Sequence, residues 1–168
     1  ISVPYFANRT VKLQLDVNTA GGTYDVYVTP EDGFKTQIAE DYRFNRNMAD
    51  TDKLYMQLLS AQGRDFRVQN LTLRDYDGEL GEDPDLKLSI DNPYFDQFDV
   101  PGWRFEDPSG GPYVTNQKAY SGNQSLKFIT LPDQGNTDVR TPLIPVNGAE
   151  GYRLNAKVFM EENVSHTF

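Results

Sequence analysis

Strict alternation of apolar and polar residues constrains this chain more than any other feature. It runs through residues 11–17 and again through residues 24–29. A period of two residues is the pattern of a β-strand with one buried face, because successive side chains of a strand point to opposite sides. Gly21 and Gly22 lie between the two runs and favour a turn. The sequence therefore predicts a β-hairpin at this point.

Short runs of β-forming residues continue along the rest of the chain. They are separated by Pro, Gly, Asn and Asp, which favour turns, and this spacing is typical of a β-sandwich or jelly roll. We therefore predict an all-β fold of sandwich or jelly-roll units. Further strands are expected at residues 35–39, 52–60, 64–74, 103–105, 113–115, 125–130, 138–141 and 152–159. The predicted core residues are Leu13, Leu15, Val26, Val28, Val68, Leu71, Leu126, Phe128, Leu154 and Val158.

Two segments depart from simple alternation. In residues 64–74 the phase of the alternation slips near Asn70, which predicts a β-bulge. Residues 47–60 contain several helix formers, so a short helix is an alternative there. We favour a strand, because no capping box precedes the segment and Gly63 ends it early.

Charge and composition exclude several classes of protein. The 168 residues carry a formal net charge of -9, and the 16 Lys and Arg residues are scattered, whereas nucleic-acid binding needs clustered cations. No apolar run approaches the roughly 20 residues that span a bilayer. The absence of cysteine excludes disulfides, thiolate zinc sites and a cysteine nucleophile.

An acidic segment that also contains Gly and Pro divides the chain in two. We predict a solvated linker over residues 76–90, between one domain at 1–75 and another at 91–168. The segment begins like a calcium-binding EF-hand loop, but it lacks the third ligand before the glycine and the final glutamate. Its carboxylates are Asp75, Asp77, Glu79, Glu82, Asp83 and Asp85.

The sequence does not predict a set of catalytic residues. Carboxylates that are adjacent in sequence, such as Glu31 and Asp32 or Glu40 and Asp41, are expected in turns, and on a strand they would point to opposite faces. A retaining glycosidase needs two carboxylates that face each other across about 5 Å. His166 lies near the end of the chain, a poor position for a rigid general base. We therefore expect no enzyme activity from this chain.

Three phrases in the first half of the chain carry a resemblance to a known family. They are TYDVYV at 23–28, IAEDYRF at 38–44 and VQNLTL at 68–73. With these phrases, residues from about 10 to 75 resemble the C-terminal half of concanavalin A-like lectin and glucanase sandwiches.

Four phrases in the second half carry another resemblance. They are DNPYFD at 91–96, PGW at 101–103, AYSGNQSLKF at 119–128 and GYRLNAKV at 151–158. In this order, residues from about 91 to 160 are similar to the opening of jelly-roll carbohydrate-binding modules attached to xylanases and laminarinases. Each stretch is about half a module, so either flanking sequence is missing or the two halves pack together. We favour missing sequence, because an unpaired half-sandwich would expose apolar edges.

These resemblances imply a sugar-binding surface in the second half. An aromatic ring can stack on the apolar face of a pyranose, and Tyr113 and Tyr120, which flank loops, are the favoured residues. Trp103 is a third candidate, although a lone tryptophan after a Pro-Gly turn is more often a core anchor.

The jelly-roll resemblance also implies a structural calcium ion. In similar modules the ion lies between the first strand and a Ser-Gly turn, and it is held by a carboxylate and backbone carbonyls. The matching positions are Asp96 for the carboxylate and Gly122 and Asn123 for the carbonyls. Such oxygen ligands suit calcium.

The leading functional prediction is non-catalytic binding of a polysaccharide or glycan by part of an extracellular or cell-surface multi-module protein. One alternative is a β-rich structural subunit of a surface layer or filament, which would self-associate by strand complementation. Another alternative is a fragment of a polysaccharide hydrolase or lyase whose catalytic residues lie elsewhere. Nucleic-acid binding and a membrane span are not expected.

Overall fold

The computed structural model is built of strands and turns. It describes residues 8–45, 53–54, 57–60, 66–76, 104–106, 113–117, 119, 122–128, 137–141, 143–146 and 151–160, and no helix occurs among them. The all-β prediction is therefore confirmed. The strands are β1 (Thr10–Asn18), β2 (Thr23–Pro30), β3 (Thr36–Arg43), β4 (Lys53–Leu54), β5 (Gln57–Ser60), β6 (Phe66–Asp75), β7 (Arg104–Glu106), β8 (Tyr113–Thr115), β9 (Ser125–Phe128), β10 (Thr137–Arg140), β11 (Ile144–Pro145) and β12 (Gly151–Met160).

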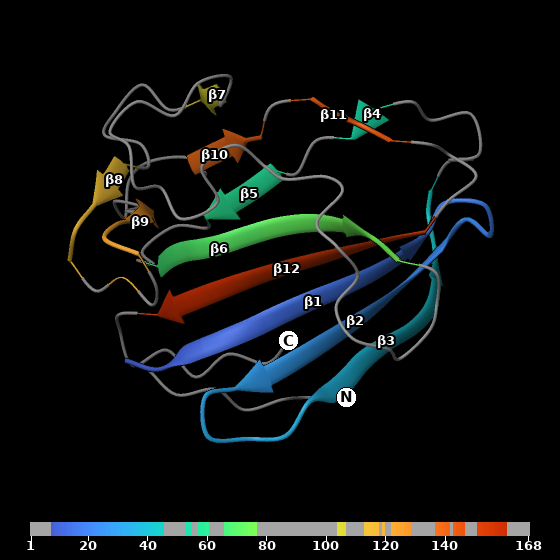
Figure 1. The fold of residues 1–168 in the computed structure, drawn as a ribbon, viewed down its shortest axis with the longest axis horizontal. Coiled ribbons are helices and arrows are strands. Elements are labelled where there is room, and N and C mark those ends of the chain that lie inside the picture. The colour runs from blue at the N-terminus through green and yellow to red at the C-terminus, as the bar shows by residue number, and fades with distance from the viewer. Residues whose placement is uncertain are drawn as a thin grey trace.

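One large antiparallel sheet dominates the structure. Its seven strands follow the order β3-β2-β1-β12-β6-β9-β8, and two smaller sheets have the orders β5-β10-β7 and β11-β4. In Figure 1 the short strands of the smaller sheets lie together beside the long strands of the large sheet. A large sheet with smaller sheets packed beside it is a sandwich architecture.

Strands from both halves of the sequence join in the large sheet. β1 pairs with β12 over nine residue pairs, from Thr10 with Phe159 to Asn18 with Gly151, and β6 lies between β12 and β9. Strands from residues 10–75 and from residues 113–160 are therefore neighbours in one sheet. The division into domains at 1–75 and 91–168 stays a prediction. Of the predicted linker, the structure describes only Tyr76.

The core lies on one face of the large sheet. Side chains from β6, β9 and β12 pack there against Val139 of β10 and Ile144 of β11, so the smaller sheets cover this face. Of the predicted core residues, five are almost fully buried: Val28, Val68, Leu71, Leu126 and Phe128. The other predicted core residues are half-buried: Leu13, Leu15, Val26, Leu154 and Val158.

The predicted bulge in β6 is confirmed. Asn70 has a φ of 54°, and the register of β6 with β12 shifts opposite this residue, between Asn155 and Lys157. The extra residue keeps both Val68 and Leu71 on the core face, although they are three positions apart in sequence.

The predicted hairpin of β1 and β2 is also confirmed. Its turn is closed by a hydrogen bond from the Gly22 N–H to the Thr19 carbonyl (3.3 Å), and Gly22 has a φ of 67°, which glycine adopts without steric cost. Asn18 caps the turn, since its Oδ1 accepts a hydrogen bond from the Gly21 N–H (2.7 Å).

Three details differ from the sequence predictions. The single strand expected over residues 52–60 consists of β4 and β5, which belong to different sheets. β11 was not expected, because a strand of two residues leaves no alternation to detect. Glu40 and Asp41 lie within β3 rather than in a turn, and the Asp41 N–H donates a hydrogen bond to Asp25 of β2 (2.8 Å).

Candidate functional site: the polar face of the large sheet

The face of the large sheet opposite the core carries polar side chains from neighbouring strands. Because side chains alternate along each strand, the residues between the core positions all point to this second face. Two cross-strand rows define its end near the start of β1. One row runs through Thr10, Phe159, Arg67 and Lys127, and the next row runs through Lys12, Lys157 and Gln69. We call this surface the polar face.

A pocket of about 390 Å³ opens on these two rows. Strands β1, β6, β9 and β12 supply its floor, and the β2–β3 turn and the β8–β9 loop supply one wall residue each. Its lining residues, among those that the structure describes, are Thr10, Glu31, Arg67, Gln69, Ala119, Ser125, Lys157 and Phe159.

Three polar side chains of the pocket are nearly inaccessible to solvent. Arg67 and Gln69 are each 3% exposed and Ser125 is 1% exposed. The guanidinium of Arg67 donates hydrogen bonds to the backbone carbonyl and the side-chain oxygen of Gln117, and Gln69 Nε2 donates to the Gln124 carbonyl (2.7 Å). Contacts with residues 117 and 124 therefore tie the β8–β9 loop to the floor of the pocket.

Ser125 differs from Arg67 and Gln69, because its hydroxyl makes no hydrogen bond with the described residues. The Oγ atom is buried and has no hydrogen-bond partner within the part of the chain that the structure describes. A buried hydroxyl without a partner costs free energy, since it loses its hydrogen bonds to water on folding. Such a group in a pocket wall needs a hydrogen-bond partner that the described residues do not supply.

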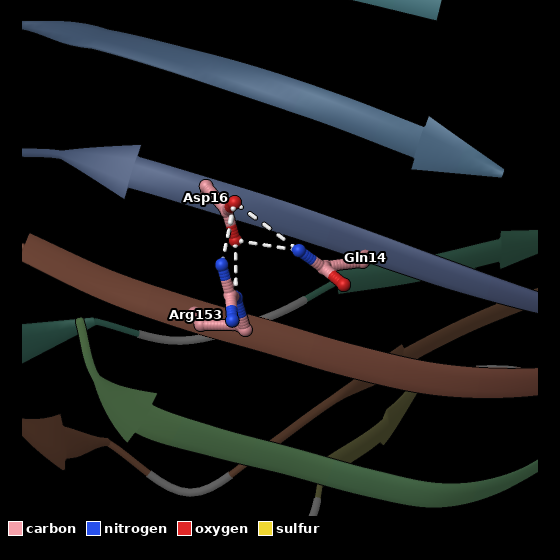
Figure 2. Close-up of polar contacts among 3 residues, drawn as sticks. All are labelled: Gln14, Asp16 and Arg153. Carbon is pink, nitrogen blue, oxygen red and sulfur yellow. Dashed lines mark hydrogen bonds and ion pairs between the residues drawn. The ribbon is translucent and has the colours of Figure 1, made fainter. Parts of the chain in front are cut away.

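At the other end of the polar face, Asp16 and Arg153 form a bidentate ion pair across β1 and β12. Arg153 Nε lies 2.7 Å from Asp16 Oδ1, and Arg153 Nη2 lies 3.0 Å from Oδ2. Gln14 Nε2 donates to both carboxylate oxygens at 3.1 Å, as Figure 2 shows. The side chains of Asp16 and Arg153 are only 6% and 12% exposed. The Asp16 carboxylate therefore accepts hydrogen bonds from both Arg153 and Gln14 at this end of the face.

Tyr76 extends the network above Arg153. The guanidinium carbon of Arg153 lies 3.9 Å from the centre of the Tyr76 ring, which is a cation–π contact. The Tyr76 N–H donates a hydrogen bond to the Gly151 carbonyl (2.9 Å), and a Cβ atom at Gly151 would collide with the Tyr76 carbonyl oxygen. Glycine at position 151 thus permits the close approach that places Tyr76 over Arg153.

The neighbouring strand β2 adds a second cation–π pair. Lys35 Nζ lies 4.0 Å from the centre of the Tyr27 ring. Burial, followed by the charges of Asp25 and Asp16, raises the pKa of Tyr27 above its usual 10.0. Burial also lowers the pKa of Lys35, although the charge of Asp16 opposes this shift.

Asn155 lies between the pocket and the ion-pair network. Its register partners are Gln14 on β1 and Thr72 on β6, which places it on the polar face. The Oδ1 atom of Asn155 is buried and has no hydrogen-bond partner among the described residues. It is the second group of this face, after Ser125, that could accept a hydrogen bond from a ligand.

The structure places only part of the predicted sugar-binding set. Tyr113 belongs to the edge strand β8, where its backbone pairs with Lys127, so position 113 continues the row that passes through Arg67 and Phe159. Tyr120 and Trp103 lie outside the described residues. The sugar-binding role predicted for these three residues stays a prediction.

The predicted calcium ligands are also described only in part. Gly122 and Asn123 form an exposed bend before β9, and Gly122 has a φ of 71°. Asp96 lies outside the described residues. Calcium takes six to eight oxygen ligands, and the described residues contain no group of three or more His, Cys, Asp or Glu side chains that could hold a metal ion. The bend could supply carbonyl oxygens only, so the calcium hypothesis depends on Asp96.

The sequence did not identify the residues of the pocket as a site. Ser125 and Lys157 occur in phrases that carry the jelly-roll resemblance, but nothing in the sequence brings them next to Arg67, which is more than 50 residues away from Ser125. The available signal was alternation, which assigns all three residues to the face opposite the core. Their proximity depends on the pairing of β6 with both β9 and β12.

Two further findings concern membrane-spanning helices and similarity to known proteins. Within the described residues, no helix is both long enough and apolar enough to cross a bilayer. Neither a protein-family model nor a curated protein matches the sequence.

Proposed function

We propose that this chain binds a polysaccharide or glycan without catalysis, and that the polar face of the large sheet is the binding surface. The observation that carries the proposal is the pocket on this face, in which the buried Ser125 hydroxyl has no hydrogen-bond partner among the residues that the structure describes. The lectin-like and carbohydrate-binding-module resemblances of the sequence point to the same class of ligand.

The chemistry of the pocket suits a sugar. A saccharide presents hydroxyl groups that both donate and accept hydrogen bonds, together with an apolar face of C–H groups. Ser125 offers a hydroxyl in return, and Asn155 offers a carbonyl oxygen farther along the face. Phe159 adds an aromatic side chain to the pocket lining, and aromatic rings are the usual partners of the apolar sugar face. Convergent polar groups beside an aromatic ring are a combination found in small-ligand sites.

The proposed setting is extracellular or at the cell surface, within a multi-module protein. Polysaccharides occur mainly outside the cell, and the acidic composition and lack of cysteine are compatible with export. Calcium that uses Asp96 with Gly122 and Asn123 remains part of this proposal, as do sugar contacts by Tyr113, Tyr120 and Trp103.

The edge strand β3 gives no support to the alternative of strand complementation. Glu40, Asp41 and Arg43 are exposed on this strand, and Asp41 has a φ of 50° where the register with β2 shifts. Charged side chains and bulges on an edge strand hinder the addition of another strand. We therefore retain glycan binding as the proposed function.

Removal of the Ser125 hydroxyl tests the proposal. The variant Ser125→Ala should keep or slightly raise the melting temperature, because it removes a buried hydroxyl that has no partner in the described protein. It should also weaken retention on the polysaccharides that bind the parent chain, as measured by affinity electrophoresis against a panel of neutral and acidic polymers.

Thr36→Ala is the matched control for this experiment. Thr36 lies on β3, at the opposite edge of the sheet, and its hydroxyl makes only a long hydrogen bond to the Phe34 carbonyl (3.4 Å). This variant should bind like the parent chain. If no polymer of the panel is retained, or if Ser125→Ala is retained as strongly as Thr36→Ala, the proposed function is wrong.

A further inference from the structure

The described lining of the pocket has a charge opposite to that of the whole chain. The formal net charge is -9, yet the described residues of the pocket lining include Arg67 and Lys157 and one carboxylate, Glu31. Glu31 Oε2 accepts a hydrogen bond from the Thr10 N–H (3.0 Å), so this carboxylate is engaged by the backbone of β1. The acidic protein thus gathers positive charge at one place.

Cations also face one another across the strands that form the pocket floor. Lys12 of β1 is the register partner of Lys157, and Arg67 of β6 is the register partner of Lys127. Like charges directly opposite each other on adjacent strands destabilise a sheet. Two such pairs lie in neighbouring rows, so the strands of the pocket floor carry their positive charges side by side.

Arg67 holds its charge at a fixed position. The side chain is 3% exposed, and its guanidinium is oriented by two oxygen atoms of Gln117. A charge that is buried and already oriented needs no reorganisation when a ligand arrives. Beside it, Ser125 Oγ can donate a hydrogen bond.

From these observations we infer that the pocket selects saccharides that carry an anionic group, a carboxylate or a sulfate. This inference rests on the proposed glycan-binding function and narrows its ligand class. The anionic group lies between Arg67 and Lys157 and accepts a hydrogen bond from Ser125. This specificity differs from a neutral sugar held by aromatic stacking, because attraction between charges weakens as salt screens it.

Paired polymers that differ only in charge test the inference. Polygalacturonate is compared with its fully methyl-esterified form, and dextran sulfate is compared with dextran, each by affinity electrophoresis and by titration calorimetry. The parent chain should bind at least one anionic polymer and should not bind the neutral form of the same polymer. Affinity should fall as salt rises from about 50 mM to about 200 mM. Binding of polygalacturonate identifies a carboxylate as the group, and binding of dextran sulfate alone identifies a sulfate.

Lys157→Gln and Lys53→Gln form a matched pair of charge variants. Both raise the net negative charge by one, but Lys53 is exposed on β4, in a different sheet. Lys157→Gln should weaken binding of the anionic polymer by about fivefold, the effect of one charge contact, and should reduce its salt dependence. Lys53→Gln should bind like the parent chain. Melting temperatures of both variants, measured by circular dichroism, show that each is folded, and Lys127→Gln replaces Lys157→Gln if the latter unfolds.

The outcomes separate the two proposals. If neutral polymers bind as tightly as their charged forms and Ser125→Ala weakens this binding, glycan binding stands and the anionic specificity is wrong. The specificity is also wrong if Lys157→Gln and Lys53→Gln have equal effects on the anionic polymer. If neither charged nor neutral polymers bind, the proposed function fails and this inference fails with it.

Discussion

At the scale of single residues, the ion pair of Asp16 and Arg153 is the best-defined interaction of the polar face. Both side chains are largely buried, their contact is bidentate, and Gln14 and Tyr76 occupy the remaining sides. Burial of two charges costs solvation free energy that their attraction must offset. The loss of stability is therefore expected to be largest when only one partner of the pair is removed.

Single and double substitutions of this pair test that expectation. Asp16→Leu or Arg153→Met alone should lower the free energy of unfolding by about 3 kcal/mol, because each leaves a buried charge without its partner. The double variant should lose clearly less than the sum of the two, as measured by urea unfolding. The surface pair of Arg9 and Asp32, whose side chains are 50% and 69% exposed, is the control, and Asp32→Ala should change stability by less than about 0.5 kcal/mol. Additive effects at Asp16 and Arg153 would contradict the coupling.

At the scale of elements, the bulge in β6 determines which residues of this strand face the core and which face the pocket. Before Asn70, Val68 faces the core while Arg67 and Gln69 face the pocket. After it, Leu71 and Leu73 face the core. Without the extra residue, one half of the strand would present its apolar residues to the polar face, because a shift by one residue inverts every side chain. The bulge therefore couples the core to the pocket.

Substitutions at Asn70 test the backbone conformation of the bulge. Its φ of 54° is accessible to asparagine and glycine but is strained for a β-branched residue. Asn70→Val should lower the free energy of unfolding by about 1–2 kcal/mol, whereas Asn70→Gly should be tolerated within about 1 kcal/mol. Thermal or urea unfolding of the two variants measures the difference. Equal losses in both would mean that the side chain of Asn70, not its backbone, is important.

At the scale of the whole molecule, the large sheet joins the two halves of the sequence. β1 is hydrogen-bonded to β12, and β6 is hydrogen-bonded to both β12 and β9. In this sheet each half leaves strand edges that only the other half completes. The core also combines the two halves, since the buried cluster contains residues 68, 71 and 73 of the first half together with residues 126, 128, 139, 144, 152 and 156 of the second.

Separation of the halves tests this topology. The full chain should unfold in one cooperative transition by calorimetry and by circular dichroism, because neither half can keep its sheet without the other. Residues 1–76 and residues 91–168, expressed separately, should each lack a cooperative transition and should gain β-structure when mixed. Two independent transitions in the full chain, or a stable fold of either half alone, would contradict the shared sheet.

The sequence by itself determined the all-β class, most of the longer strands, the β1–β2 hairpin and the bulge at Asn70. These features are local, because alternation, turn residues and a phase slip act over a few neighbouring residues. The shortest strands escaped detection, since two residues at Ile144–Pro145 contain no periodicity.

The tertiary structure alone decided which strands are neighbours, and therefore which polar residues form the pocket. Arg67, Ser125 and Lys157 belong to three strands, β6, β9 and β12, that are far apart in sequence. Alternation assigns each of them to a face, but hydrogen bonding between strands has no sequence-specific code, so only the packing of the complete core selects the order of the strands. The same reason explains why two stretches that resemble separate half-modules combine into one sheet.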